Sequence, residues 1–116
     1  MELLEQMEDM GRRAKEASYL LGRLGTEEKN QGLLAAADGL LAHTESILAA
    51  NALDMENGRK RGMHQGLLDR LALNEARIEA MAEGLKQIVT LEDPIGEVLS
   101  MKKRPNGLLI GEKRVP

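Results

Sequence analysis

The stretch from Thr26 to Gly62 carries the longest helical signal in the chain, and it limits the possible folds more than any other segment. Thr26 is expected to cap the N-terminus of this stretch, and Gly62 is expected to end it. Gly32 and Gly39 lower the helix propensity by about 1 kcal/mol each relative to alanine, so close packing is expected around them. A broad apolar face is formed by Leu33, Leu34, Ala37, Leu40 and Leu41.

The helical pattern falters at Ala42-His43-Thr44 and then resumes. Thr44, followed by Glu45, could cap a second helix, or a single helix could kink at this point. We favour two helices that meet at a bend.

Asn51 is the one polar residue on the apolar side of the second half of this stretch. A buried asparagine must be hydrogen-bonded, because an unpaired polar group away from water costs free energy. Its side chain could contact a ligand or an interface, or it could form a structural hydrogen bond to a loop backbone. We favour the structural hydrogen bond.

The N-terminal segment repeats apolar residues at alternating steps of four and three, which predicts an amphipathic helix from Leu3 to Leu24 that stops at Gly25. Such a stripe fits either a coiled-coil partner helix or an ordinary helix packed on its neighbours, and we favour the second. Further on, Met63–Gly66 is expected to be a loop, Leu67–Leu73 a short helix, and Asn74 the N-cap of a helix that ends before Asp93-Pro94.

After Pro94 the pattern changes to two short strands, 98–104 and 108–115, around Pro105-Asn106-Gly107. Asn-Gly between apolar runs is typical of a β-hairpin. The predicted fold class is therefore mainly α helices followed by a β-hairpin. Because two strands alone are barely stable in water, the chain is expected to be truncated after the hairpin.

The composition argues for a small aliphatic core. Tyr19 is the single aromatic residue in 116, so leucine, isoleucine, methionine, valine and alanine must supply the core. The net charge of -3 argues against a nucleic-acid partner. The acidic N-terminus is not a secretory signal and no apolar run is long enough to span a membrane, so we expect a cytoplasmic protein without a membrane partner.

No catalytic, cofactor-binding or metal-binding residue can be assigned from the sequence. The chain has no cysteine, which removes thiol nucleophiles and thiolate ligands. His43 and His64 lack any metal-ligand spacing and are expected in surface loops. The carboxylate pairs Glu8-Asp9 and Glu27-Glu28 are expected to be solvated charge.

Several segments in order resemble one family. They are TEEKN, ILAANALDMENGRKRG, LLDRLALNEARIEAMAEGLKQI, LEDPIGEVL and RPNGLLIGEKRVP. Together they resemble the N-terminal region of gamma-glutamyl phosphate reductase (glutamate-5-semialdehyde dehydrogenase), of the aldehyde dehydrogenase superfamily. The chain departs from the family pattern at Lys102-Lys103, where many relatives have an aromatic residue in the strand.

This resemblance implies an NADPH-dependent enzyme of proline biosynthesis that reduces L-glutamate 5-phosphate to L-glutamate 5-semialdehyde. In the family a cysteine thiolate attacks the acyl phosphate, and hydride then reduces the thioester; here that cysteine and the cofactor loops would lie beyond Pro116, which leaves this part inactive. Residues 1–94 would be a helical segment of the cofactor-binding domain, and residues 95–116 a hairpin of the oligomerisation sheet in a homo-oligomer.

Two other hypotheses stay open at this point. One is a stand-alone helical interaction or scaffold module that grips a partner through the heptad stripe and the hairpin edge. The other is a different member of the aldehyde dehydrogenase superfamily. The reading frame beyond Pro116 separates the module from the reductase, and an activity assay separates the two enzymes.

Overall fold

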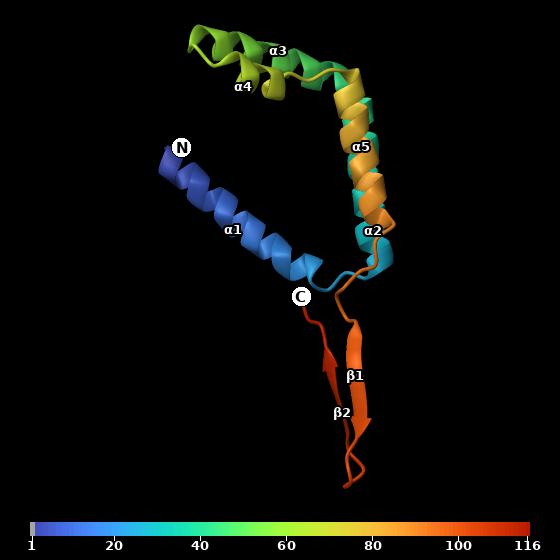
Figure 1. Cartoon of the computed structure of the whole chain (residues 1–116). Coiled ribbons are helices and arrows are strands. Elements are labelled where there is room, and N and C mark those ends of the chain that lie inside the picture. Colours follow the sequence, from blue (N-terminus) through green and yellow to red (C-terminus); the bar gives the residue numbers. More distant parts are fainter. Residues whose placement is uncertain (1) are drawn as a thin grey trace. The chain divides into compact units, whose positions relative to one another are not determined.

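The structure is a computed structural model, and it describes residues 2–116. Within that range the chain folds into five helices followed by a two-stranded antiparallel hairpin, which confirms the predicted fold class (Figure 1). The elements are α1 (Leu3–Leu21), α2 (Thr26–Ala42), α3 (Thr44–Lys60), α4 (Gln65–Leu71), α5 (Glu75–Val89), β1 (Val98–Lys103) and β2 (Leu109–Lys113).

The described residues divide into two compact units. One unit is Asn30–Leu91, which holds most of α2 and all of α3, α4 and α5. The other joins the segment that ends at Lys29 to Glu92–Pro116, and so contains α1, the first turn of α2 and the hairpin.

The long helical stretch is two helices, as predicted. α2 ends at Ala42, α3 begins at Thr44, and the two are bent by 69°. The Thr44 hydroxyl donates to the Leu41 carbonyl at 2.9 Å, and the imidazole Nδ1 of His43 lies 2.8 Å from the Gly39 carbonyl oxygen. A threonine that bonds back to the preceding turn is a known cause of helix bending.

No single helix among residues 2–116 is both long enough and apolar enough to cross a membrane; α2 and α3 meet that length and composition test only as a bent pair.

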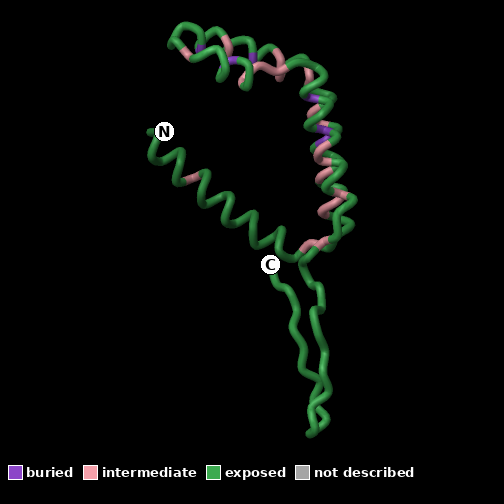
Figure 2. Tube along the Cα trace, in the orientation of Figure 1, coloured by how far each residue is buried: buried purple, intermediate pink, exposed green. Residues whose placement is uncertain are grey.

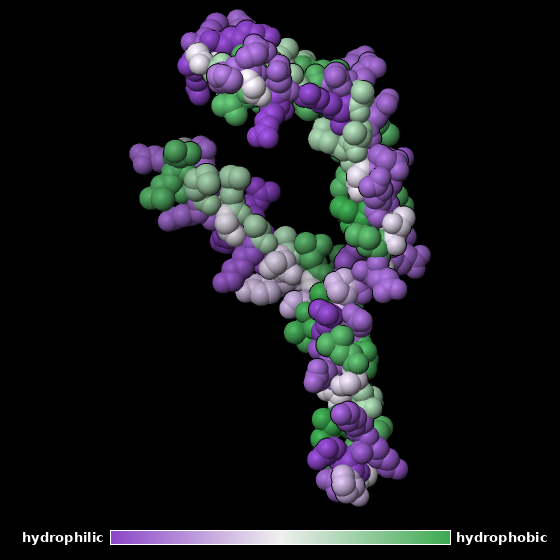
Figure 3. All heavy atoms as spheres, in the orientation of Figure 1, coloured by the Kyte–Doolittle hydropathy of each residue, from purple (hydrophilic) through white to green (hydrophobic). Residues whose placement is uncertain are grey.

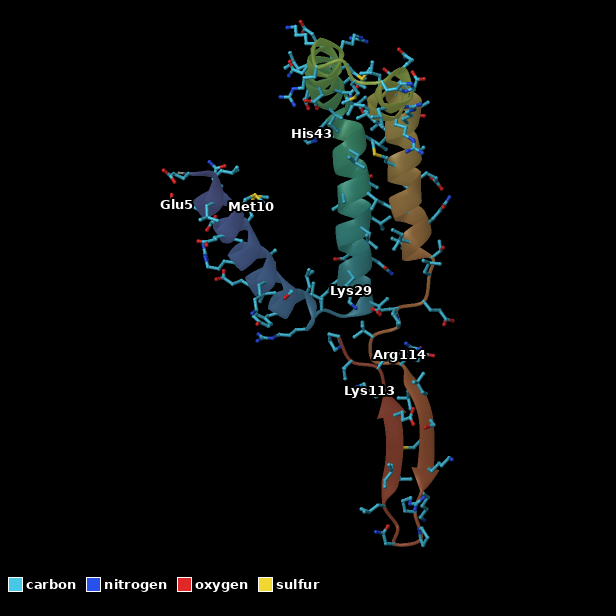
Figure 4. The ribbon with its side chains drawn as sticks, turned by 60° about the vertical axis from the view of Figure 1, so that its left-hand side comes forward. Glu5, Met10, Lys29, His43, Lys113 and Arg114 are labelled. Atoms are coloured by element: carbon cyan, nitrogen blue, oxygen red, sulfur yellow. The ribbon has the colours of Figure 1, made fainter. Side chains whose placement is uncertain are left out.

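The core of the Asn30–Leu91 unit is small. α2 and α5 lie side by side, and the buried positions cluster where the helices of this unit meet (Figures 1, 2 and 4). Ile78 is the largest fully buried side chain among the described residues, and a buried isoleucine contributes roughly 1.5–3 kcal/mol. The buried apolar side chains of the described chain are Ala37, Leu68, Ile78 and Ala82. This confirms the expectation of a small aliphatic core.

Asn51 ties α3 to the segment between α4 and α5. Its side chain is 9% exposed, its Nδ2 donates to the Leu71 carbonyl at 2.9 Å, and its Oδ1 accepts from the Leu73 amide at 2.9 Å. The Asn51 side chain therefore satisfies both the carbonyl of Leu71, at the end of α4, and the amide of Leu73, just beyond it. The favoured structural interpretation of Asn51 is confirmed.

Close contact between α3 and α4 depends on Gly58. A Cβ at this position would lie 3.1 Å from Cδ2 of Leu68 and 3.4 Å from the Met63 sulfur. The expected close packing at Gly32 and Gly39 is wrong for the described residues, because nothing lies within 4 Å of a Cβ built at either position.

Several helix ends differ from the predictions. Thr26 is the first residue of α2 and not its cap: the Gly25 carbonyl accepts from the Lys29 amide at 3.1 Å, and the Thr26 hydroxyl bonds elsewhere. α1 ends at Leu21 with Gly22 as its C-cap, so the predicted stop at Gly25 is wrong by one turn.

The loop predicted at 63–66 is also too long. α4 begins at Gln65, and Nδ1 of His64 caps it by accepting from the Gly66 amide at 3.1 Å. Asn74 caps α5 as predicted, with its Oδ1 accepting from the Arg77 amide at 2.8 Å.

α1 has no buried residue, so the predicted packing of its stripe on neighbouring elements is wrong for the described residues (Figure 2). Leu3, Met7 and Met10 on this stripe are more than half exposed. The helix is held by interactions along its own length, such as the bond from the Glu2 amide to the Glu5 carboxylate at 3.2 Å.

Replacing Asn51 by alanine is expected to lower the free energy of unfolding by about 1–3 kcal/mol, because it leaves two partly buried backbone groups without partners. Denaturant unfolding followed by circular dichroism measures the change. Asn57→Ala is the matched control, since Asn57 is an exposed asparagine of the same helix, and it is expected to change stability by less than about 0.5 kcal/mol. Equal effects of the two substitutions would contradict the role of Asn51.

Candidate functional site: the hairpin and its base

β1 and β2 pair antiparallel, with Met101 opposite Gly111 and Lys103 opposite Leu109. The register is irregular between Val98 and Ser100. At the turn, Gly107 adopts a φ of 89°, which favours glycine, and its amide donates to the Arg104 carbonyl at 2.9 Å. The Asn-Gly pair thus makes the predicted turn, while the strands are shorter than predicted and stop at Lys103 and Lys113.

Glycine is required at position 111, because Ser100 on the opposite strand lies too close for a side chain. A Cβ at this position would lie 2.5 Å from the carbonyl oxygen of Ser100, which is backbone and cannot rotate away. A side chain larger than hydrogen would therefore push the two strands apart at the middle of their pairing.

Every residue of both strands is exposed (Figure 2). Apolar and charged side chains alternate along the hairpin surface (Figure 3). The apolar strand residues are Val98, Leu99, Met101, Leu109 and Ile110, and each is at least half exposed. A two-stranded hairpin also presents unpaired N–H and C=O groups along its edges. This combination is typical of a surface that pairs with another strand.

An open hollow of about 310 Å³ lies on the hairpin and is lined by Ser100, Lys102, Arg104, Ile110, Gly111 and Glu112. Its charges are of both signs, and neither histidine lines it. Glu112 lies opposite Ser100 in the register, but among the described residues no hydrogen bond joins the two side chains, so the hollow does not hold the bonded nucleophile–base pair that acyl transfer uses. Its exposed lining of charged, polar and apolar side chains is suited to contact with another surface.

The carboxylate of Asp93 holds the base of the hairpin. Its Oδ2 accepts from the Thr26 hydroxyl at 2.9 Å and from the Lys29 ammonium at 2.7 Å, and its Oδ1 accepts from the Ile95 amide at 3.0 Å. Figure 4 shows Lys29 in the first turn of α2, beside the segment that leads into β1. The Lys29 bond, the Ile95 amide and the Thr26 hydroxyl lower the pKa of Asp93 from 3.8 to about 2.

The first residues of the hairpin are tied to its last ones. The Gly96 amide donates to the Arg114 carbonyl at 2.9 Å, and the Arg114 amide donates to the Glu97 carbonyl at 2.9 Å. Arg114, labelled in Figure 4, also forms an ion pair with Glu97 at 3.1 Å. Asp93 therefore joins a closed hairpin base, and not a single loose strand, to the start of α2.

The local sequence marks Asp93 only as part of a helix break before Pro94. The residue before a proline leaves the helical region, and an aspartate there caps the amide two residues on, which predicts the Ile95 bond. Nothing in the sequence links Asp93 to Thr26 and Lys29, which precede it by 67 and 64 residues.

The other candidate residues from the sequence are the two histidines and the carboxylate pairs. Within residues 2–116 no group of three or more histidine, cysteine, aspartate or glutamate side chains could hold a metal ion. His43 and His64 are exposed and lie outside the helices, as expected, and their rings bond to backbone atoms at the α2–α3 junction and at the α4 N-terminus. Asp9 forms an exposed ion pair with Arg12, which confirms that this carboxylate is solvated charge.

Comparison with known proteins gives one consistent result. The chain is 54% identical over 113 residues to gamma-glutamyl phosphate reductase of Lachnospira eligens, covering 97% of this chain and 27% of that protein. It is 59% identical over 106 residues to gamma-glutamyl phosphate reductase of Heliobacterium modesticaldum, covering 91% of this chain and 25% of that protein. No family model matches the chain.

The fold comparison agrees. The crystal structure of gamma-glutamyl phosphate reductase from Thermotoga maritima superposes with a TM-score of 0.87 at 39% identity, covering 90% of this chain and 25% of that one. The present chain thus spans about a quarter of the length of the relatives that it matches.

Acid is expected to release the Asp93 contacts only well below its ordinary pKa. The folded pKa is depressed to about 2, so Asp93 stabilises the fold above the unfolded pKa, and this contribution is lost as the pH falls through the folded value. An NMR titration of the Asp93 carboxyl carbon together with the Ile95 amide measures the midpoint. A midpoint at the ordinary 3.8 would contradict the three-bond arrangement.

Proposed function

We propose that this chain, which is homologous to the N-terminal region of the gamma-glutamyl phosphate reductases, is the N-terminal part of an enzyme that reduces L-glutamate 5-phosphate to L-glutamate 5-semialdehyde with NADPH in proline biosynthesis. The observation that carries this proposal is the identity of 54% over 97% of the chain, together with the shared fold. Resemblance of this extent supports the same reaction, although fold alone would not.

The residues of this chain do not fit the nicotinamide cofactor or the catalytic step. Within residues 2–116 the one pair of strands forms a hairpin, so no glycine-rich loop runs from a parallel strand into a helix to take the dinucleotide phosphates. The sequence has no cysteine that could attack the acyl phosphate. We therefore place the catalytic and cofactor-binding residues in the remaining three quarters of the enzyme.

The role of this region in the proposal is structural. Residues 1–94 supply helices to the cofactor-binding domain, and residues 95–116 supply the hairpin to a sheet that joins subunits of a homo-oligomer. The exposed strands with apolar side chains on both faces support this assignment, because an isolated pair of strands gains stability when further strands pair with it. The enzyme would act in the cytoplasm on a small-molecule substrate, without a nucleic-acid or membrane partner.

The stand-alone module is not favoured by the comparisons. A module that evolved to grip an unrelated partner has no reason to keep 54% identity with a reductase along 97% of its length. A different aldehyde dehydrogenase is distinguished from the reductase by its substrate.

The intact protein is expected to reduce NADP⁺ in the presence of L-glutamate 5-semialdehyde and phosphate, which is the proposed reaction run in reverse and followed by NADPH absorbance. Omitting phosphate is expected to abolish the signal, since the acyl phosphate cannot form without it. The 116 residues alone are expected to be inactive because they contain no cysteine. Oxidation of simple aldehydes without any requirement for phosphate would overturn the proposed substrate.

Assembly through the hairpin predicts a specific effect of Gly111→Ala. The new methyl group would meet the Ser100 carbonyl, so the hairpin would distort and subunit association would weaken by roughly tenfold, equivalent to about 1.4 kcal/mol. Sedimentation equilibrium of the intact protein measures the association. Gly84→Ala in α5 is the matched control, because nothing lies within 4 Å of its Cβ, and it is expected to leave association unchanged.

A further inference from the structure

Asp93 uses its two carboxylate oxygens for two different tasks. Oδ1 accepts from the Ile95 amide at 3.0 Å and so sets the turn at Pro94. Oδ2 accepts from Thr26 at 2.9 Å and from Lys29 at 2.7 Å, and both donors lie in the first turn of α2. The same group therefore fixes the local path of the chain and its attachment to a helix far away in sequence.

The attachment is shielded from solvent more than an ordinary surface ion pair. The Asp93 side chain is 14% exposed and that of Lys29 is 28% exposed. By contrast, the ion pair between Arg12 and Glu16 on α1 is 60% and 63% exposed. A partly buried pair with an additional hydroxyl donor is screened less by water and salt, so its geometry is better defined.

The hairpin itself offers little else to fix its direction. All residues from Pro94 to Pro116 are exposed, so no buried apolar contact holds them. The bonds of Gly96 and Arg114 close the hairpin base on itself, and Asp93 connects that base to α2. A two-stranded element that is free to swing must lose that freedom before it pairs with another strand, which weakens association.

We propose that Thr26, Lys29 and Asp93 form a clasp that holds the hairpin base in the position from which it pairs with a second copy of the chain. The pairing step rests on the homo-oligomer of the proposed function. The three residues are positioning residues: they do not touch the partner, and they act by removing the conformational freedom of the hairpin before association.

The test uses the intact protein with Lys29→Met and Asp93→Asn. Lys29→Met removes the charge partner of Oδ2 and keeps the Ile95 bond, whereas Asp93→Asn removes the negative charge itself. Each is expected to raise amide hydrogen exchange at Gly96 and Arg114 by about fivefold or more and to weaken association by a similar factor. Thr26→Val, which removes one hydroxyl donor, is expected to have a smaller effect in the same direction.

Asp69→Asn is the matched control. Asp69 accepts from the exposed Gln65 amide at 2.9 Å on α4, so the substitution makes the same chemical change away from the hairpin. It is expected to leave exchange at Gly96 and association unchanged. Lys29→Met combined with Asp93→Asn is expected to add little to either single change, because both break one interaction.

The outcomes separate the clasp from the assembly on which it acts. Wild-type exchange at Gly96 and Arg114 in both Lys29→Met and Asp93→Asn would overturn the clasp. Faster exchange with unchanged association in an oligomeric protein would overturn its role in pairing. A wild-type protein that is monomeric at all concentrations would overturn the homo-oligomer itself and with it the pairing step. Should Asp93→Asn fail to fold, Lys29→Met and Thr26→Val decide the same question.

Discussion

The two hydrogen bonds of Asn51 are the interaction on which the Asn30–Leu91 unit most depends. Four apolar side chains are buried in the described chain, and the largest of them is Ile78, so apolar burial alone offsets little of the chain entropy lost on folding. Asn51 binds the backbone at Leu71 and Leu73, where the chain leaves α4 and turns toward α5. A side chain that satisfies two partly buried backbone groups fixes this turn, and with it the start of α5.

At the hairpin base, as at Asn51, side-chain hydrogen bonds fix the position of the chain, and here the acceptor Asp93 and one donor are charged. This segment has no buried apolar contact, and Asp93 holds it instead by accepting three hydrogen bonds. The donors are the Thr26 hydroxyl, the Lys29 ammonium and the Ile95 backbone amide. Such bonds are directional, whereas apolar contact is not, so a few of them define a position that a thin core leaves undefined. The cost is that each bond must be complete, because a partly satisfied group away from water is destabilising.

Residues that act on their own neighbourhood are predictable together with their partners, whereas the partners of residues that act over long distances are not. Asn74 caps the helix directly after it, and the Asn106-Gly107 pair makes the turn between its own flanking strands. Asn51 stood out because it interrupts an apolar face. Thr26 was assigned as a cap because the local pattern fits one, yet its hydroxyl is taken by Asp93, a partner 67 residues away that no local pattern contains.

Exposed apolar residues distinguish α1 and the hairpin from the core of the Asn30–Leu91 unit. α1 and the hairpin present half-exposed leucine, methionine and isoleucine side chains, and this chain spans about a quarter of the length of its relatives. Apolar surface of this extent is stable in water when something covers it. The Asn30–Leu91 unit is folded around its own small core, whereas the hairpin has exposed faces and a fixed base. An element that is anchored at one end and uncovered along its strands is suited to receive a partner, and this is the physical reason that we propose assembly through the hairpin and not through the helices of the Asn30–Leu91 unit.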